Sequence, residues 1–209
     1  MEGKGKHIIP KVYTLYQRYG VKSVTMDDVA KHLGISKKTL YEYFTDKEDL
    51  VKQVLVWDYN RKLDFFLKIE KKNLNAVEEL FEVYKMIKEI FTDYNPSAEY
   101  DIRKYYPALF AQLREIKRKR MFELSMMNMN KGRKEGLYRN DLNASIIARL
   151  HVFRVENILE SELFSIEEIT SIKVFHEIFV YHLNGILSDE GRKILDANHK
   201  KFFRMAKDT

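Results

Sequence analysis

The fold of this chain is decided near its N-terminus by the stretch VTMDDVAKHLGISKKTLYEYFTDKEDL, residues 24–50. Thr25 is a favourable N-cap residue, and Asp28 three positions later can complete a capping box, so a helix is expected over Met26–Leu33. Gly34 follows directly and can adopt the left-handed backbone conformation that ends a helix. The stretch therefore begins with a short helix and a glycine turn.

Two further helices are expected to begin in the same stretch. Ser36 is an N-cap residue for a second helix of about two turns, and Thr45, with Glu48 at the box position, is one for a third helix. A short helix, a glycine turn and a second short helix have the spacing of a helix-turn-helix. The side chains expected to face inward are Val29, Ala30, Leu33, Leu40 and Phe44.

The opposite surface of the second helix suits contact with DNA. Lys37 and Lys38 in its first turn can reach phosphates or guanine edges, and Thr39 can bond a phosphate or touch a thymine methyl. Tyr41 and Tyr43 add hydroxyl groups on stiff side chains. Short capped helices also occur in many globular proteins, so periodicity alone leaves a purely structural role equally open.

The whole chain is expected to be helical. Of its residues 45% are hydrophobic, while only 8 Gly and 3 Pro interrupt the sequence, which favours an all-α protein of roughly nine or ten helices. Besides those within residues 24–50, the helices are expected over residues 8–19, 47–71, 75–94, 99–105, 107–134, 143–162, 168–187 and 189–206.

Composition also limits the classes of function. The formal net charge of +6 and the pI of about 9.2 suit a nucleic-acid partner or an anionic membrane surface. Because the chain has no cysteine, disulfides, cysteine zinc sites and thiol nucleophiles are excluded. No secretory apolar segment follows Met1, and no run of about 18 apolar residues exists, so a cytoplasmic protein without a membrane span is expected.

Nothing in the sequence indicates an enzyme. The 6 histidines form no His-Glu-x-x-His motif and no Glu-x-x-His pair of the di-iron kind. A phosphate-binding glycine loop and a Gly-x-Ser-x-Gly elbow are also missing from the sequence. We therefore expect no catalytic residue, no metal site and no cofactor.

Residues 24–50 resemble the DNA-binding signature of the TetR/AcrR family of transcriptional regulators. The matching positions are Thr25, Val29-Ala30, Gly34-Ile35-Ser36, Thr39-Leu40-Tyr41, Phe44 and Lys47-Glu48 before Leu50. The resemblance implies a three-helix DNA-binding domain over residues 1–51, whose third helix enters the major groove. It also implies a helical regulatory and dimerisation domain over residues 52–209.

The resemblance also assigns roles within the DNA-binding region. Thr25, Tyr43 and Lys47 resemble phosphate contacts, while the positions near the bases are Lys37, Lys38 and Thr39, with Tyr41 beside them. Glu42 could accept a hydrogen bond from a cytosine amine. The interpretation that we favour is that Glu42 faces solvent beside Lys38 as a charge pair four residues apart.

For the C-terminal region the resemblance implies a dimer interface and a small-molecule pocket. The expected interface residues are Ile146, Leu150, Phe153, Asn157, Ile172, His176, Phe179 and Leu183. The candidate ligand-binding residues are Tyr84, Phe91, Tyr105, Phe110, Phe122, Met126 and Phe153. Both sets also fit an ordinary subunit core.

The function implied is that of a homodimeric regulator, a repressor, which binds a palindromic operator in double-stranded DNA and is released by a small-molecule effector. Two other classes stay open. A membrane-surface protein would use its basic charge on lipid headgroups, although such proteins use one long amphipathic helix rather than three short capped ones. A sequence-blind DNA binder would show a steep salt dependence and little discrimination between sequences.

Overall fold

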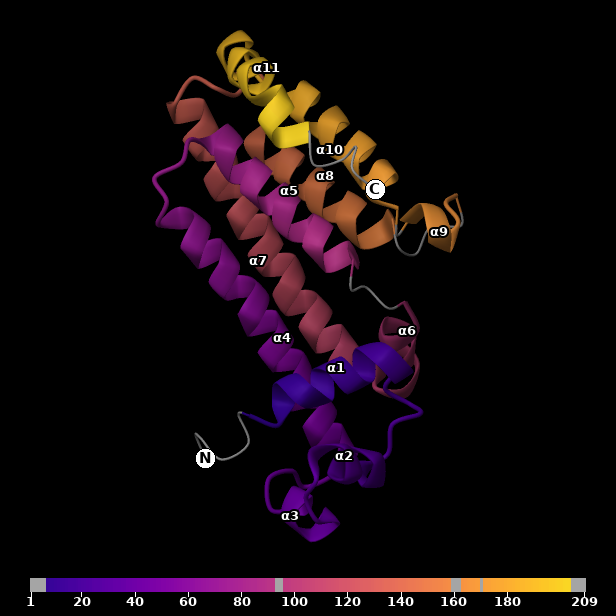
Figure 1. Ribbon diagram of the computed structural model, residues 1–209. Coiled ribbons are helices and arrows are strands. Elements are labelled where there is room, and N and C mark those ends of the chain that lie inside the picture. Colours follow the sequence, from indigo (N-terminus) through magenta and orange to yellow (C-terminus); the bar gives the residue numbers. More distant parts are fainter. Residues whose placement is uncertain (1–6, 93–95, 159–162, 170, 204–209) are drawn as a thin grey trace. The chain divides into compact units, whose positions relative to one another are not determined.

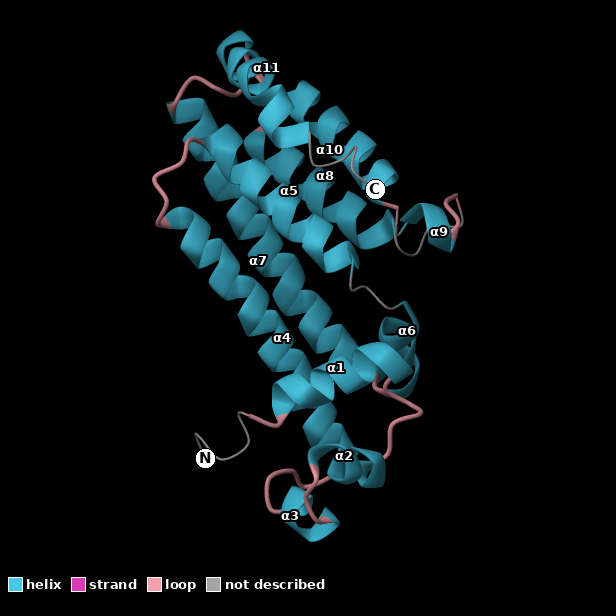
Figure 2. Cartoon of the chain, viewed as in Figure 1, coloured by secondary structure: helices cyan, strands magenta, loops and turns pink. Residues whose placement is uncertain are grey.

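The computed structural model describes residues 7–92, 96–158, 163–169 and 171–203 (Figure 1). Within these residues every regular element is a helix, as Figure 2 shows, so the expected all-α class is confirmed. The helices are α1 Ile9–Tyr19, α2 Met26–Leu33, α3 Lys37–Tyr41, α4 Lys47–Glu70, α5 Ala76–Thr92, α6 Pro96–Tyr105, α7 Pro107–Lys134, α8 Ala144–Ile158, α9 Ile166–Ile169, α10 Ile172–Ile186 and α11 Asp189–Phe203.

The capping signals of α2 are confirmed. The backbone N–H of Asp28 donates to Thr25 Oγ1 at 3.1 Å, and the backbone N–H of Thr25 donates to Asp28 Oδ2 at 2.9 Å. Gly34 follows α2 with φ 68° and ψ 28°, the left-handed conformation that a side chain would disfavour. Helix α2 therefore begins and ends where the sequence places it.

Helix α3 is shorter than expected. It ends at Tyr41 after five residues, whereas about two turns were predicted. A tight turn follows the helix, because the N–H of Tyr43 donates to the carbonyl of Leu40 three residues back. This turn directs Phe44 into the core, where its side chain is 1% exposed.

The predicted cap of α4 was wrong by one residue. Asp46, rather than Thr45, accepts the capping hydrogen bond, which the N–H of Asp49 donates to Asp46 Oδ1 at 2.8 Å. Asp49 in turn accepts from the N–H of Thr45 at 3.1 Å. The two hydrogen bonds do not form a reciprocal capping box, because the N–H that Asp49 accepts from belongs to Thr45 and not to the N-cap residue Asp46, and Glu48 takes part in neither bond.

Two later helices also differ from the expected bounds. Helix α6 begins at Pro96 rather than at Glu99, since proline is well suited to the first helical position. Helix α10 begins at Ile172 instead of residue 168, because Ser171 caps it by accepting from the N–H of Lys173. Ile166–Ile169 form α9, a separate helix of four residues that the sequence did not predict.

The chain forms two compact units. The first contains residues 1–67 and 93–115, so it joins α1–α3 and most of α4 to α6 and the start of α7. In this unit α1 packs against both α2 and α6 (Figure 1). Its core residues are Ile8, Val12, Leu15, Tyr16, Val21, Val24, Met26, Val29, Ala30, Leu40, Phe44, Leu50, Val51, Val54, Leu109 and Leu113. A functional boundary after residue 51 stays a prediction.

The second unit contains residues 68–92 and 116–209. Helix α5 packs against α10 and α11, with the ring of Phe81 edge-on to that of Phe179. Tyr138 lies buried after α7, where its hydroxyl donates to the carbonyl of Ala76 at 3.0 Å. A side chain at Gly132 would overlap the Tyr138 ring, so this helical glycine allows the tyrosine to pack.

In the described part of the chain, no helix is both long and apolar enough to cross a membrane.

Candidate nucleic-acid interface

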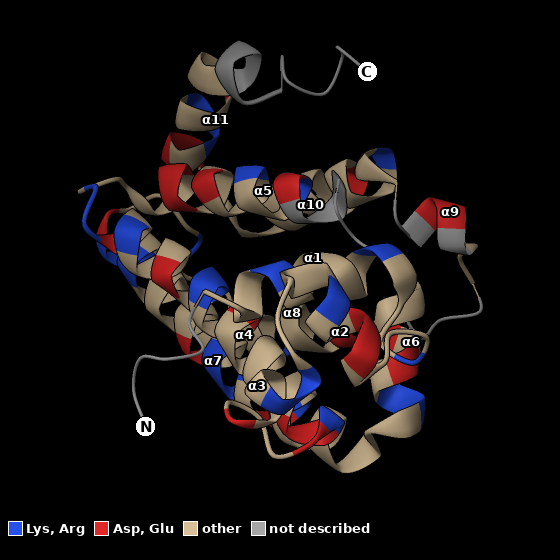
Figure 3. Ribbon diagram, turned by 60° about the horizontal axis from the view of Figure 1, so that its bottom comes forward, with Lys and Arg blue, Asp and Glu red and all other residues tan. Residues whose placement is uncertain are grey.

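The helix-turn-helix presents the expected polar residues on an anchored short helix. Leu40 anchors α3 in the core of the first unit, since its side chain is fully buried. Around it Lys37, Lys38 and Tyr41 are exposed, while Thr39 is half-buried. Helix α2 carries both acidic and basic residues, whereas the charged residues of α3 are the basic Lys37 and Lys38 (Figure 3). The surface is therefore mixed in charge rather than uniformly basic.

Lys37 carries an acidic partner that the sequence analysis did not consider. Its Nζ lies 2.8 Å from Oδ1 and 3.1 Å from Oδ2 of Asp27 on α2. The hydrogen bond and charge of Asp27 raise the pKa of Lys37. The side chains are 54% and 66% exposed, so water screens the pair and a phosphate can compete for the ammonium.

Thr39 is tied to the cap of its own helix. Its backbone N–H donates to Ser36 Oγ at 3.0 Å, and its own Oγ1 lies 2.8 Å from the same oxygen. The Thr39 hydroxyl thus shares a hydrogen bond with Ser36, while its methyl group can contact an apolar group such as a thymine methyl.

The Thr25 hydroxyl is similarly engaged. Thr25 Oγ1 donates to Asp28 Oδ2 at 2.6 Å and accepts from the Asp28 N–H. These hydrogen bonds from Thr25 are the main reason that the pKa of Asp28 is lowered. A phosphate could accept from the Thr25 hydroxyl only after this bond to the carboxylate is given up.

Lys47 lies at the first position of α4 and is only partly exposed. Its Nζ donates to the carbonyl oxygen of Lys22, in the turn between α1 and α2, at 3.1 Å. Burial lowers the pKa of Lys47, while the carboxylates of Asp101 and Asp28 act in the opposite direction. An ammonium group has three N–H donors, so Lys47 retains donors for a phosphate beyond the one used on Lys22.

Tyr43 is the phosphate candidate with the clearest structural role. Its side chain is half-buried and packs against the core of the first unit, with its ring 6.4 Å from that of Phe44. The buried part of the Tyr43 side chain therefore contributes to the packing of the first unit. Lys22, Asp27 and Asp101 are the residues near this surface that sequence reasoning missed.

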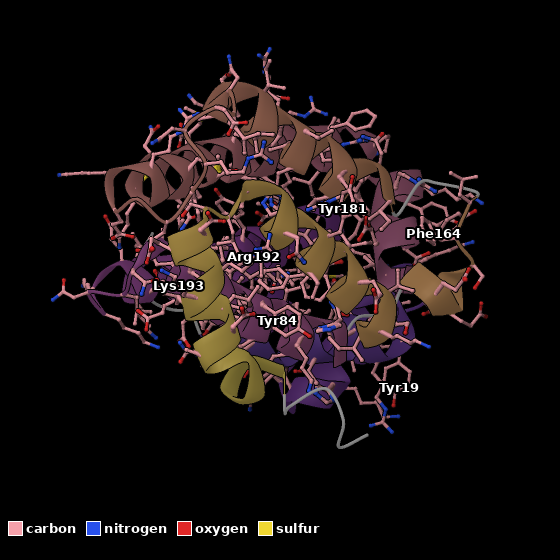
Figure 4. The ribbon with its side chains drawn as sticks, turned by 90° about the horizontal axis from the view of Figure 1, so that it is seen from above. Tyr19, Tyr84, Phe164, Tyr181, Arg192 and Lys193 are labelled. Carbon is pink, nitrogen blue, oxygen red and sulfur yellow. The ribbon has the colours of Figure 1, made fainter. Side chains whose placement is uncertain are left out.

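The candidate ligand-binding residues belong to both compact units and differ in exposure. Tyr84, labelled in Figure 4, is buried against α10, where its hydroxyl lies 3.1 Å from Nδ1 of His176. Tyr105 is 39% and Phe153 63% exposed, so neither lines an interior. Phe110, Phe122 and Met126 are half-buried on α7, and the side chain of Phe91 lies outside the described residues.

An open groove of about 810 Å³ lies instead along α8, α9 and α10. Tyr181 and Phe164, both labelled in Figure 4, line it together with Arg154, Val174 and Ile178. None of the candidate ligand-binding residues lines this groove.

Some of the residues expected in the dimer interface are exposed, and others are half-buried or buried. On α8, Ile146, Leu150 and Phe153 form an apolar face whose side chains are 53%, 58% and 63% exposed. Asn157 and Ile172 are half-buried on α8 and α10.

The interface prediction for α10 was wrong in part, because Phe179 and Leu183 lie in the core of the subunit at 8% and 0% exposure. His176 belongs to the same inner side, since it bonds Tyr84. The large exposed ring of α10 is Tyr181, at 79%.

The imidazole rings of His151 and His182 lie close together inside the second unit. The rings of His151 on α8 and His182 on α10 lie 5.1 Å apart. Burial lowers the pKa of His151 to about 4 and that of His182 to about 3, and the neighbouring Arg154 acts in the same direction. Both side chains are therefore neutral near pH 7.

Comparison with known proteins agrees with this geometry. Residues 13–54 match the model of the tetR family of bacterial regulatory proteins. The chain is 26% identical over 187 residues to the uncharacterized HTH-type transcriptional regulator YvaF of Bacillus subtilis, a match that covers 88% of this chain and 96% of the relative. It is 26% identical over 107 residues, 51% of each chain, to IcaR, the HTH-type negative transcriptional regulator of the biofilm operon icaADBC in Staphylococcus epidermidis.

A solved structure supports the fold over nearly the whole chain. The transcriptional regulator from Cytophaga hutchinsonii superposes with a TM-score of 0.72 at 22% identity, covering 88% of this chain and 100% of that one. The relatives are regulators rather than enzymes, which confirms the expectation that this chain is not an enzyme. From its matched helix-turn-helix and its full-length relative, the chain belongs to the tetR family of helix-turn-helix transcriptional regulators.

Proposed function

We propose that this chain is a homodimeric repressor that binds a palindromic operator and leaves it when a small-molecule effector binds. The observation that carries the proposal is the short helix α3, which Leu40 and Phe44 anchor in the core while Lys37, Lys38 and Tyr41 stay exposed. An anchored helix with exposed donors is what reading of base edges requires.

In this proposal the two sets of contacts have different tasks. Lys37, Lys38 and Thr39 approach base edges from α3, with Tyr41 beside them. Thr25, Tyr43 and Lys47 hold phosphates and so fix the register without reading sequence. The functional DNA-binding domain then ends near residue 51, and residues 52–209 regulate and dimerise.

A second copy of the chain is the partner that the exposed face of α8 supports. Ile146, Leu150 and Phe153 lie three and four residues apart on this helix, and each is more than half exposed. A contiguous exposed apolar stripe indicates a protein contact. A two-fold dimer also gives two recognition helices, as a palindromic site one helical turn apart requires.

IcaR, which is similar over half of the chain, is a negative regulator, and this supports repression. Release requires an effector that binds one conformer of the dimer more tightly than the other. The buried aromatic residues around Tyr84 and the groove beside Tyr181 are the regions in which effector binding can be sought.

The experiment is a binding titration of the purified chain on DNA from upstream of its own gene. Labelled duplex is competed with unlabelled specific and random DNA at about physiological salt, and liposomes of anionic lipid are tested in parallel. Specific binding of two chains per duplex supports the proposal. Equal competition by random DNA would instead indicate a sequence-blind binder, and binding to liposomes alone would indicate a membrane-surface protein.

A further inference from the structure

The turn between α1 and α2 is held from two sides through one residue, Lys22. Its backbone N–H donates to Asp101 Oδ2 on α6 at 2.7 Å. Its carbonyl oxygen accepts from Lys47 Nζ, at the start of α4, at 3.1 Å. The backbone of Lys22 therefore connects an acid of α6 to the cation that we propose binds a DNA phosphate.

Other contacts at the same place limit how this turn can move. The Nζ of Lys22 lies 4.8 Å above the ring of Tyr105, also on α6. Gly20 has φ +79°, and a Cβ atom there would lie 2.9 Å from Asp101 Oδ2. A side chain at residue 20 would therefore crowd the carboxylate of Asp101 in its present position.

The charge of Asp101 acts on Lys47 as well. Burial lowers the pKa of Lys47, and Asp101 is the largest influence in the opposite direction. The carboxylate therefore favours the charged ammonium at a site where partial burial disfavours it.

We propose that Asp101 is a positioning residue for DNA binding: by holding Lys22, it places the ammonium of Lys47 where a backbone phosphate of the operator can accept from it. The inference rests on the proposed function, because it concerns the same DNA-binding surface. It gives α6 a direct effect on affinity for DNA, although Asp101 need not touch the DNA itself.

The direction in which Asp101→Ala changes operator affinity distinguishes a positioning role from a simple effect of charge. Removing an acid from a DNA-binding domain should tighten binding, because phosphates are then repelled less. We expect Asp101→Ala to weaken operator binding instead, by about tenfold, since a hydrogen bond to a charged group is lost and Lys47 is released. Asp64→Ala, which removes the same charge from an exposed site on α4, is the matched control and should not weaken binding.

A double-mutant comparison tests whether Asp101 acts through Lys47. Operator affinity is measured by fluorescence anisotropy at several salt concentrations for Asp101→Ala, Lys47→Ala and the double variant. If Lys47 carries the effect, the double variant should bind no more weakly than Lys47→Ala alone. Asp101→Ala should also flatten the dependence of log affinity on log salt by about one phosphate contact.

Two further variants of Asp101 distinguish loss of the contact to Lys22 from loss of folding. Asp101→Asn keeps an oxygen acceptor for the Lys22 N–H and should retain most of the affinity. Asp101→Glu keeps the charge on a side chain one methylene longer, which displaces the carboxylate from the Lys22 N–H, so it should lose affinity even if the alanine variant does not fold. Melting temperature and oligomeric mass are measured for every variant.

The proposal is overturned if Asp101→Ala or Asp101→Glu binds the operator as tightly as the unmodified chain. It is equally overturned if the losses from Asp101→Ala and Lys47→Ala multiply in the double variant. If the unmodified chain shows no preference for its own DNA, the proposed function has failed, whatever these variants do.

Discussion

Removing the Lys47 ammonium should weaken binding to all DNA sequences alike. Phosphate contacts carry no base information, so Lys47→Ala should lower affinity for operator and random duplexes by the same factor. Each phosphate contact contributes about 0.9 to the slope of log affinity against log salt. A rise in salt from about 50 to about 200 mM should therefore shrink the affinity ratio of unmodified to variant protein by about 3.5-fold.

The assay is fluorescence anisotropy on labelled operator and on a random duplex of equal length, at four salt concentrations. Lys68→Ala is the control, because it removes the same charge from an exposed position near the end of α4. Its affinity and slope should stay close to those of the unmodified chain. The reasoning is refuted if Lys47→Ala leaves the slope unchanged, or if it changes the preference for operator over random DNA.

Three more predictions follow from single contacts. Asp27→Ala frees Lys37 from its ion pair, so binding to random DNA should tighten and its salt slope should steepen by about 0.9; an unchanged slope would contradict this. Leu150→Glu puts a charge on the exposed face of α8 and should give a folded monomer by light scattering, whereas an intact dimer would place the interface elsewhere. Because burial lowers the pKa values of His151 and His182 to about 4 and about 3, their contribution to stability is complete above the ordinary value of about 6.5 and is lost as pH falls towards those values. The melting temperature should fall over this range, and less steeply in His182→Gln; identical pH profiles would contradict the assignment.

The local signals in the sequence were sufficient to place α2, the Gly34 turn and the start of α3, although not the length of α3. The partners of the Thr25 and Ser36 caps lie three residues away, and the Gly34 turn depends on a single backbone conformation. Such features are properties of short segments, so sequence determines them directly. The cap of α4 was misplaced because Thr45 and Asp46 are adjacent and both are good N-cap residues.

Features that depend on distant segments could not be predicted in the same way. Helix α10 is apolar on more than one face, so its periodicity could not show that Phe179 and Leu183 pack inward while Tyr181 faces out. Asp101 and Lys22 are 79 residues apart, and no local pattern connects them. Their contact follows from the packing of α1 against α6, which only the folded unit shows.

Operator binding by the unmodified chain tests the central claim most directly. The purified protein is titrated onto its own upstream DNA, with random DNA as competitor at about physiological salt, and the number of chains on each duplex is measured. The account predicts a specific complex of two chains that random DNA does not displace. Binding that random DNA removes as readily as specific DNA, or no binding at all, would contradict it.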